Sequence, residues 1–184
     1  ITHGDEDHAG EALNIINNIK VKNIMLNKNE LNQMEKQIIK KSNIVEEYKS
    51  KYFDFKILND KIYNDENKDS LITYFNINNN YFLYMGDSYK EQELELLKKY
   101  KLKVDIIKLG HHGSKTSSDY NFLKTINPSL AIISSGRNNK FNHPSKETTA
   151  SLNDLKIKYY NTQDKGTIKI KIRLNRLYYF FNSP

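Results

Sequence analysis

The pattern of apolar and polar positions predicts strands and helices that alternate along most of the chain. Runs rich in β-branched and aromatic residues predict strands, at 21–26, 53–58, 104–110, 130–136, 157–162 and 166–181. Apolar residues at helical spacing predict helices, at 10–19, in part of 30–51, and at 89–100, 119–126 and 147–155. Segments 70–77 and 81–87 flank an asparagine-rich turn and predict a β-hairpin. Such alternation is typical of an α/β fold with helices packed on the faces of a sheet.

The length of 184 residues suits one compact domain, and we expect residues 1–184 to form a single one. The chain begins with Ile rather than Met, and a dense group of polar side chains stands at the start with no strand before it. We therefore expect a fragment of a longer protein. No apolar run reaches the ~18 residues of a membrane span, and no signal peptide is recognisable, so this piece is expected to be soluble.

Charge and cysteine content restrict the chemistry. The formal charge of +7 would suit a polyanion such as DNA or RNA. A coding bias toward A and T would explain the abundant Lys, Asn, Ile and Tyr equally well. Because the chain has no cysteine, disulfides and thiolate ligands are excluded, and any metal must be held by His, Asp or Glu.

The histidines all fall in loops beside the ends of predicted strands, at His3, His8, His111, His112 and His143. Such loops assemble ligand and active sites in α/β folds. The opening stretch ITHGDEDHAG adds Asp5 and Asp7, spaced too tightly for one helical face, so we expect a tight loop there. Imidazole and carboxylate groups suit zinc, manganese or iron, and two such metals ~3.5–4 Å apart can clamp a phosphodiester. Alternatively, the carboxylates only cap the following helix.

Four motifs in order resemble the metallo-β-lactamase-fold hydrolase domain of the ComEC competence family, which is also called the DNA internalisation-related family. They are HGDEDHAG, YMGD, KLGHHGSKTSS and NPSLAIISSGRNNKFNHP, and the agreement extends to about residue 168. The resemblance implies a metallo-β-lactamase-like αβ/βα sandwich, here without its first N-terminal strands. It also implies a metal-dependent deoxyribonuclease domain joined to a membrane channel.

The resemblance implies six metal ligands: His3 and Asp5 for a first metal, Asp7, His8 and His111 for a second, and Asp87 between the two. Asp5 stands where the superfamily has a histidine, and no histidine lies between residues 9 and 110 to supply its middle ligand. The first site is therefore expected to be rich in oxygen or weakly occupied. One or two divalent ions are implied, manganese or zinc, with magnesium as the alternative.

The later motifs supply candidate groups for the substrate. Small hydroxyls and amides ahead of a helix suit phosphate oxygens. The expected substrate-binding residues are His112, Ser114, Thr116, Ser117, Ser118 and Asn139. Asp7, Lys115 and His143 are the expected catalytic residues, the last two by assisting at phosphate oxygens. Ordinary turn chemistry explains the serines equally well, and we expect the tyrosines to pack within strands rather than stack on bases, including Tyr159, Tyr160, Tyr178 and Tyr179.

The resulting prediction is a hydrolase that cleaves phosphodiester bonds of DNA, expected to be single-stranded, during uptake. It would lie on the extracytoplasmic side of a bacterial cell membrane, attached to a channel domain. A free-standing, cytoplasmic metallo-β-lactamase-fold hydrolase of a small ester or phosphodiester remains an alternative. So does a degenerate domain that binds DNA without cutting it, because the middle histidine is missing and Asp5 departs from the superfamily pattern.

Overall fold

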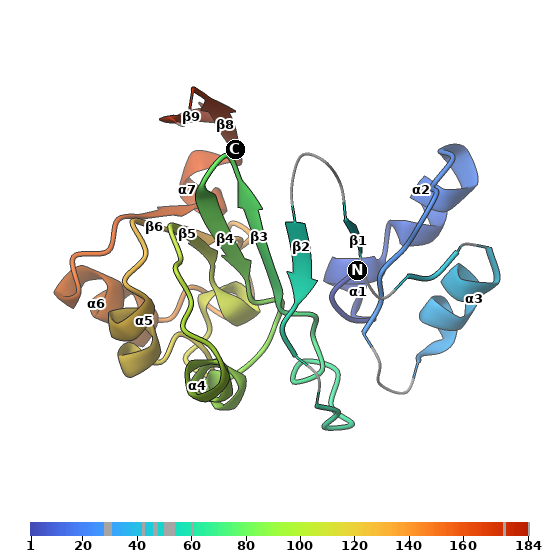
Figure 1. The fold of residues 1–184 in the computed structure, drawn as a ribbon, viewed down its shortest axis with the longest axis horizontal. Coiled ribbons are helices and arrows are strands. Elements are labelled where there is room, and N and C mark those ends of the chain that lie inside the picture. The colour runs from blue at the N-terminus through green and yellow to red at the C-terminus, as the bar shows by residue number, and fades with distance from the viewer. Residues whose placement is uncertain are drawn as a thin grey trace.

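The computed structural model describes residues 1–27, 31–41, 43–45, 48–49, 54–59, 61–174 and 176–183 (Figure 1). A seven-stranded sheet, whose strands lie in sequence order, forms the centre of the fold. The strands are β1 (Tyr48–Lys49), β2 (Asp54–Ile57), β3 (Thr73–Ile77), β4 (Asn80–Tyr84), β5 (Ile106–Lys108), β6 (Leu130–Ile133) and β7 (Tyr159–Asn161). β1 to β4 pair antiparallel, and β4 to β7 pair parallel. The carboxyl ends of β4 to β7 therefore lie at one edge of the sheet, where α/β folds place their sites.

Adjacent residues of the central strands face opposite sides of the sheet, because the side-chain period of a strand is two. Leu83, Ile107 and Ala131 face one side, where they pack with apolar residues of α4 (Lys90–Lys99), α5 (Tyr120–Ile126) and α6 (Lys146–Asp154). These three helices lie together on the left of Figure 1. The side chains of Phe82, Ile106 and Leu130 face the other side and pack against a separate hairpin of β8 (Thr167–Arg173) and β9 (Arg176–Asn182).

The N-terminal segment forms a second, smaller apolar cluster. The segment contains α1 (Glu6–Ala9), α2 (Ala12–Asn18) and α3 (Gln33–Lys41). The buried residues of the cluster are Ile24, Leu26 and Ile38, which pack with apolar residues of α2 and α3. In Figure 1 it lies at the end of the molecule nearest β1. Among the described residues, no helix has both the length and the apolar character needed to cross a bilayer.

The predicted hairpin, the helices of the second half and the central strands are confirmed, with bounds shifted by a few residues. Asn78 and Asn79 make the hairpin turn, and both adopt positive φ angles, which asparagine tolerates. Asp119 begins α5 by accepting hydrogen bonds from two backbone amides. These elements were predictable because their signals are local.

Several predictions about the fold were wrong. Segment 21–26 forms one isolated bridge, between Ile24 and Ile44, because its apolar side chains pack beside α2 and α3 instead of joining a sheet. The opening loop contains the single helical turn α1. Segment 166–181 is two strands, since the chain turns at Leu174, whose φ angle is 49°. The chain also turns into a short helix, α7 (Thr162–Lys165), directly after β7. Parts of the predicted helical segment 30–51 lie outside the described residues.

Candidate metal centre

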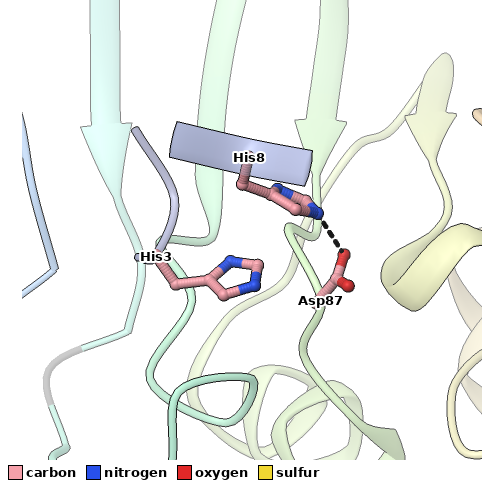
Figure 2. A group of neighbouring side chains, drawn as sticks. All are labelled: His3, His8 and Asp87. Atoms are coloured by element: carbon pink, nitrogen blue, oxygen red, sulfur yellow. Dashed lines mark ion pairs between the residues drawn. The ribbon is translucent and has the colours of Figure 1, made fainter. Parts of the chain in front are cut away.

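Four side chains from three separate segments converge at the carboxyl edge of the central strands. Asp7 and His8 come from α1, Asp87 follows β4, and His112 follows β5 in the 3₁₀ turn η1 (Gly110–Gly113). His8 Nε2 lies 3.1 Å from Asp87 Oδ1, and His112 Nε2 lies 3.0 Å from Asp7 Oδ2 and 3.3 Å from Asp87 Oδ2. Figure 2 shows His8 and His3 beside Asp87, with the His8 to Asp87 pair dashed.

The opposite ring nitrogen of each of these histidines has its own partner. His112 Nδ1 donates to the Ser134 carbonyl oxygen 2.7 Å away, which leaves Nε2 as the nitrogen that faces Asp7 and Asp87. His8 Nδ1 bonds the Thr2 hydroxyl at 2.9 Å, and His3 Nδ1 bonds the Ser70 hydroxyl at 3.0 Å. Metal-binding histidines are commonly oriented in this way. With His8 Nε2 only 3.3 Å from His112 Nε2, the arrangement fits a divalent cation held between imidazoles and carboxylates.

His3 begins a second group of potential ligands beside the first. Its side chain is fully buried, its Nε2 has no hydrogen-bond partner, and that atom lies 3.5 Å from Asp5 Oδ2. Glu66 reaches this group from the loop before β3, where its Oε2 accepts a hydrogen bond from Gly4 N at 3.3 Å. The structure thus places a carboxylate near His3, where the sequence offered no third histidine.

The electrostatics favour a charged Asp87 and a neutral His3. Burial alone would raise the pKa of Asp87, but hydrogen bonds from His112 and His8 hold it well below its usual range. The hydrogen bond to Asp87 raises the pKa of His112. Burial, with the neighbouring His8, lowers the pKa of His3. A charged carboxylate and a neutral imidazole are the ligand forms that a cation requires.

Of the two adjacent histidines in the turn after β5, His112 rather than His111 lies beside the carboxylates of the cluster. Both residues have positive φ angles, 45° and 54°, so their side chains leave the turn in different directions. His112 joins Asp7 and Asp87, whereas His111 bonds the Thr116 hydroxyl at 3.0 Å and stacks on Tyr89. The geometry therefore favours His112 as the ligand after β5 and leaves His111 outside the cluster.

A cavity of about 370 Å³ opens beside the cluster. Asp7 and His112 line it together with Asn139 and His143. Asn139 holds the loop by bonding both backbone groups of His143, at 2.7 and 2.8 Å. His143 Nδ1 has no hydrogen-bond partner, and burial lowers the pKa of this histidine, so it is neutral near pH 7.

The serine-rich loop supports the site rather than lining the cavity. Ser117 Oγ donates to the Gly110 carbonyl at 2.7 Å, while the Ser118 amide donates to Glu93 at 2.7 Å. Ser114 Oγ accepts hydrogen bonds from both the amide and the hydroxyl of Thr116. Lys115 is exposed and is not among the residues lining the cavity.

The structure also adds residues that sequence reasoning missed. Ser134, Phe141 and Thr162 line the cavity. Lys108 is the last residue of β5, and its ammonium donates a hydrogen bond to the Gly86 carbonyl 3.4 Å away. Burial lowers the pKa of this lysine. A lysine within the otherwise apolar run VDIIKLG was the available signal for this last residue.

Comparison with known proteins finds relatives whose names refer to competence and recombination. No family model matches the chain. It is 29% identical to "ComE operon protein 3" of Bacillus subtilis (strain 168) over 94% of this chain and 24% of that protein. It is 31% identical to "Recombination protein 2" of Haemophilus influenzae over 61% of this chain and 14% of that protein. Against "Competence protein ComA" of Neisseria gonorrhoeae, identity is 32% over 54% of this chain and 16% of that protein.

The chain thus spans at most about a quarter of the length of these relatives, at 24%, 14% and 16%. A crystal structure from Parabacteroides distasonis, described as a metal-dependent hydrolase, superposes with a TM-score of 0.55 at 14% identity. It covers 89% of this chain and 74% of its own, and at this identity it supports the fold. The sequence similarity to these relatives and the fold together support a ComEC-like domain with a metallo-β-lactamase-like fold.

Proposed function

We propose that this chain is a metal-dependent hydrolase that cleaves phosphodiester bonds of DNA. The observation that carries the proposal is the convergence of two imidazole Nε2 atoms and two carboxylates at the mouth of an open cavity. Nothing in the hydrophobic core requires this many ionisable groups in one place, and each would cost free energy to bring together without a ligand. Their donor types suit manganese or zinc, with magnesium as the alternative.

In this proposal Asp7, His8, Asp87 and His112 hold one cation. His3 and Asp5 hold a second, with Glu66 supplying the carboxylate that replaces the missing histidine. A divalent cation bound there supplies Lewis-acid activation of water and stabilises negative charge on phosphoryl oxygens. The position at His3 and Asp5 is rich in carboxylates, which favours a hard ion such as manganese or magnesium.

The chain's own residues handle the substrate. His143 lines the cavity, where its imidazole can hydrogen-bond a phosphoryl or leaving oxygen. Asp7 stands at the mouth of the cavity, with a side chain 65% exposed, where it can orient an incoming water. His111 and Thr116, bonded to each other, and the serines fix the loop that carries His112. Lys115 is left to contact the substrate backbone from outside the cavity.

The relatives support DNA as the substrate. Their names refer to competence and recombination, and the structural neighbour is described as a metal-dependent hydrolase. The charge of +7 suits a polyanion. We extend the proposal to a domain that acts beside a membrane channel, on the extracytoplasmic side, during DNA uptake.

The test is cleavage of a fluorescently labelled single-stranded oligonucleotide with manganese, with zinc and with EDTA. Asp7→Ala combined with His8→Ala removes two ligands, and Asp154→Ala on α6 is the matched carboxylate control. We expect cleavage that requires metal, survives in the control and falls at least ~100-fold in the double variant. Metal content by mass spectrometry should fall in the same variant.

Two results would redirect the assignment. A protein that binds metal and cleaves bis-p-nitrophenyl phosphate or p-nitrophenyl acetate but leaves DNA intact would be a hydrolase of small esters. A protein that holds no metal and cuts nothing, yet binds the oligonucleotide, would be a DNA-binding domain without catalysis.

A further inference from the structure

The β8–β9 hairpin has two chemically different faces. On one face Ile170, Ile172, Leu177 and Tyr179 pack against the central sheet. The other face includes three neighbouring pairs of residues that lie directly across the hairpin from each other: Lys169 with Phe180, Lys171 with Tyr178, and Arg173 with Arg176. All six are exposed. We call these six residues the outer hairpin face.

The outer hairpin face combines positive charge with aromatic rings. It holds four cations, and no Asp or Glu occurs anywhere in residues 166–184. Tyr178 and Phe180 are 44% and 46% exposed, although a strand of a globular protein normally turns such rings inward. Lys171 Nζ lies 5.1 Å from the centre of the Phe180 ring, so charge and ring occur side by side. Tyr178 lies in a strand, as predicted, but on its exposed face, whereas Tyr179 packs against the central sheet.

We propose that the outer hairpin face binds single-stranded DNA. Its cations would neutralise backbone phosphates while Tyr178 and Phe180 stack on bases, which is how proteins bind single strands without reading their sequence. Two residues of a strand span ~6.8 Å, so the two rings lie at a spacing that separate bases can occupy. Duplex DNA would use only the cations, because its bases are stacked on one another and present no free faces.

The hairpin is joined in the chain to the wall of the cavity. Thr162 lines the cavity beside Asp7 and begins α7, and Gly166, at a φ angle of 63°, turns the chain from α7 into β8. Arg137 donates a hydrogen bond to the Gln163 carbonyl of this connecting segment at 3.2 Å, beside a second hollow that Asp164 also lines. Figure 1 shows the hairpin directly beyond α7 and well apart from α1. The outer hairpin face would therefore hold the strand at a distance from the bond that is cut.

This inference rests on the proposed function, since it names a holding surface for the same substrate. Binding is therefore measured separately from cleavage, by fluorescence anisotropy of a labelled oligo(dT) in EDTA. The variants are Tyr178→Ala, Tyr178→Phe and Lys171→Glu. Tyr120→Ala, at a tyrosine 39% exposed on α5, and Lys98→Glu on α4 are the matched controls.

We expect Tyr178→Ala to weaken binding about 5- to 100-fold, the range for loss of one stacked base, while Tyr178→Phe binds as the wild type does. Lys171→Glu should weaken binding and reduce the slope of log K against log salt by about 0.7 or more. Neither control should change binding more than about twofold. Thermal melts of every variant verify folding.

The proposal is overturned if Tyr178→Ala and Lys171→Glu bind oligo(dT) as the wild type does, or if the controls weaken it equally. Equal competition by duplex DNA would refute stacking. Vesicles of phosphatidylglycerol that bind the wild type but not Tyr178→Ala, with DNA binding unchanged, would make the face a membrane contact instead. Failure of cleavage with intact, Tyr178-dependent DNA binding would refute only the proposed hydrolase. Hydrolysis of bis-p-nitrophenyl phosphate should be unaffected in the hairpin variants.

Discussion

Adjacent histidines in the turn after β5 provide the sharpest test of the metal centre. Changing His112 to Ala removes the imidazole that lies 3.0 Å from Asp7 and 3.3 Å from Asp87. Changing His111 to Ala removes one hydrogen bond, to Thr116 at 3.0 Å, and ring contacts that include Tyr89 at 5.5 Å and His143 at 5.6 Å between centroids. The two substitutions delete the same chemical group from neighbouring positions.

The expected magnitudes differ widely. Loss of a partner that only orients a metal ligand costs about 10- to 100-fold in affinity, so loss of a direct ligand should cost at least ~100-fold, or about 2.7 kcal/mol. His111→Ala should leave metal affinity within about threefold. It should lower the free energy of unfolding by about 1–2 kcal/mol, because the hydrogen bond and the ring contacts of His111 are lost.

Isothermal titration with manganese and with zinc, on protein stripped with EDTA, measures both affinities. Urea unfolding in EDTA measures the stability of each variant. The assignment of His112 would be refuted by normal metal affinity in His112→Ala together with a large loss in His111→Ala. A large loss in both variants would instead indicate that the turn itself must be intact for binding.

Three further predictions concern the groups around the centre. Ser70→Ala should weaken metal binding about 10- to 100-fold in titrations without touching a ligand, because the Ser70 hydroxyl bonds His3 Nδ1 and the Asp87 amide, each at 3.0 Å. Glu93→Ala should lower the free energy of unfolding by about 2–4 kcal/mol in urea, because two amides ahead of α5 each lose a 2.7 Å acceptor; an unchanged midpoint would contradict this. In EDTA, the difference in stability between wild type and Asp87→Asn should be greatest between about pH 4 and 6.5. It should shrink at lower pH, since the pKa of Asp87 is depressed from 3.8, and at higher pH, since that of His112 is raised from 6.5; a flat pH profile would count against the pairing.

Local signals in the sequence were enough for much of the fold and for part of the site. The asparagine turn between β3 and β4, the Asp119 cap of α5 and the alternating apolar strands each depend on neighbours a few residues away. His8 and Asp87 were also identifiable, because short motifs place His8 in an opening loop and Asp87 at a strand end. The family resemblance was carried by the same local motifs, and the relatives agree with it.

Long-range contacts settled what local signals left open. Glu66 approaches the N-terminal loop because the segment before β3 folds back against Gly4, and no pattern near either residue encodes that contact. The isolated Ile24 to Ile44 bridge likewise depends on packing with α2 and α3. Backbone angles in the turn after β5 decided which of two adjacent histidines faces Asp87.

For this protein, then, the sequence by itself determined the class of fold, the family resemblance and the inventory of candidate metal-binding side chains, since these follow from periodicity and from motifs a few residues long. Tertiary structure alone decided that His112 faces the cluster and that Tyr178 lies on the outside of the hairpin. The direction of the Tyr178 side chain depends on the turn at Leu174 and on the strand register of the hairpin. A change of one residue in register moves every side chain to the opposite face, so only the folded chain fixes which groups meet a ligand.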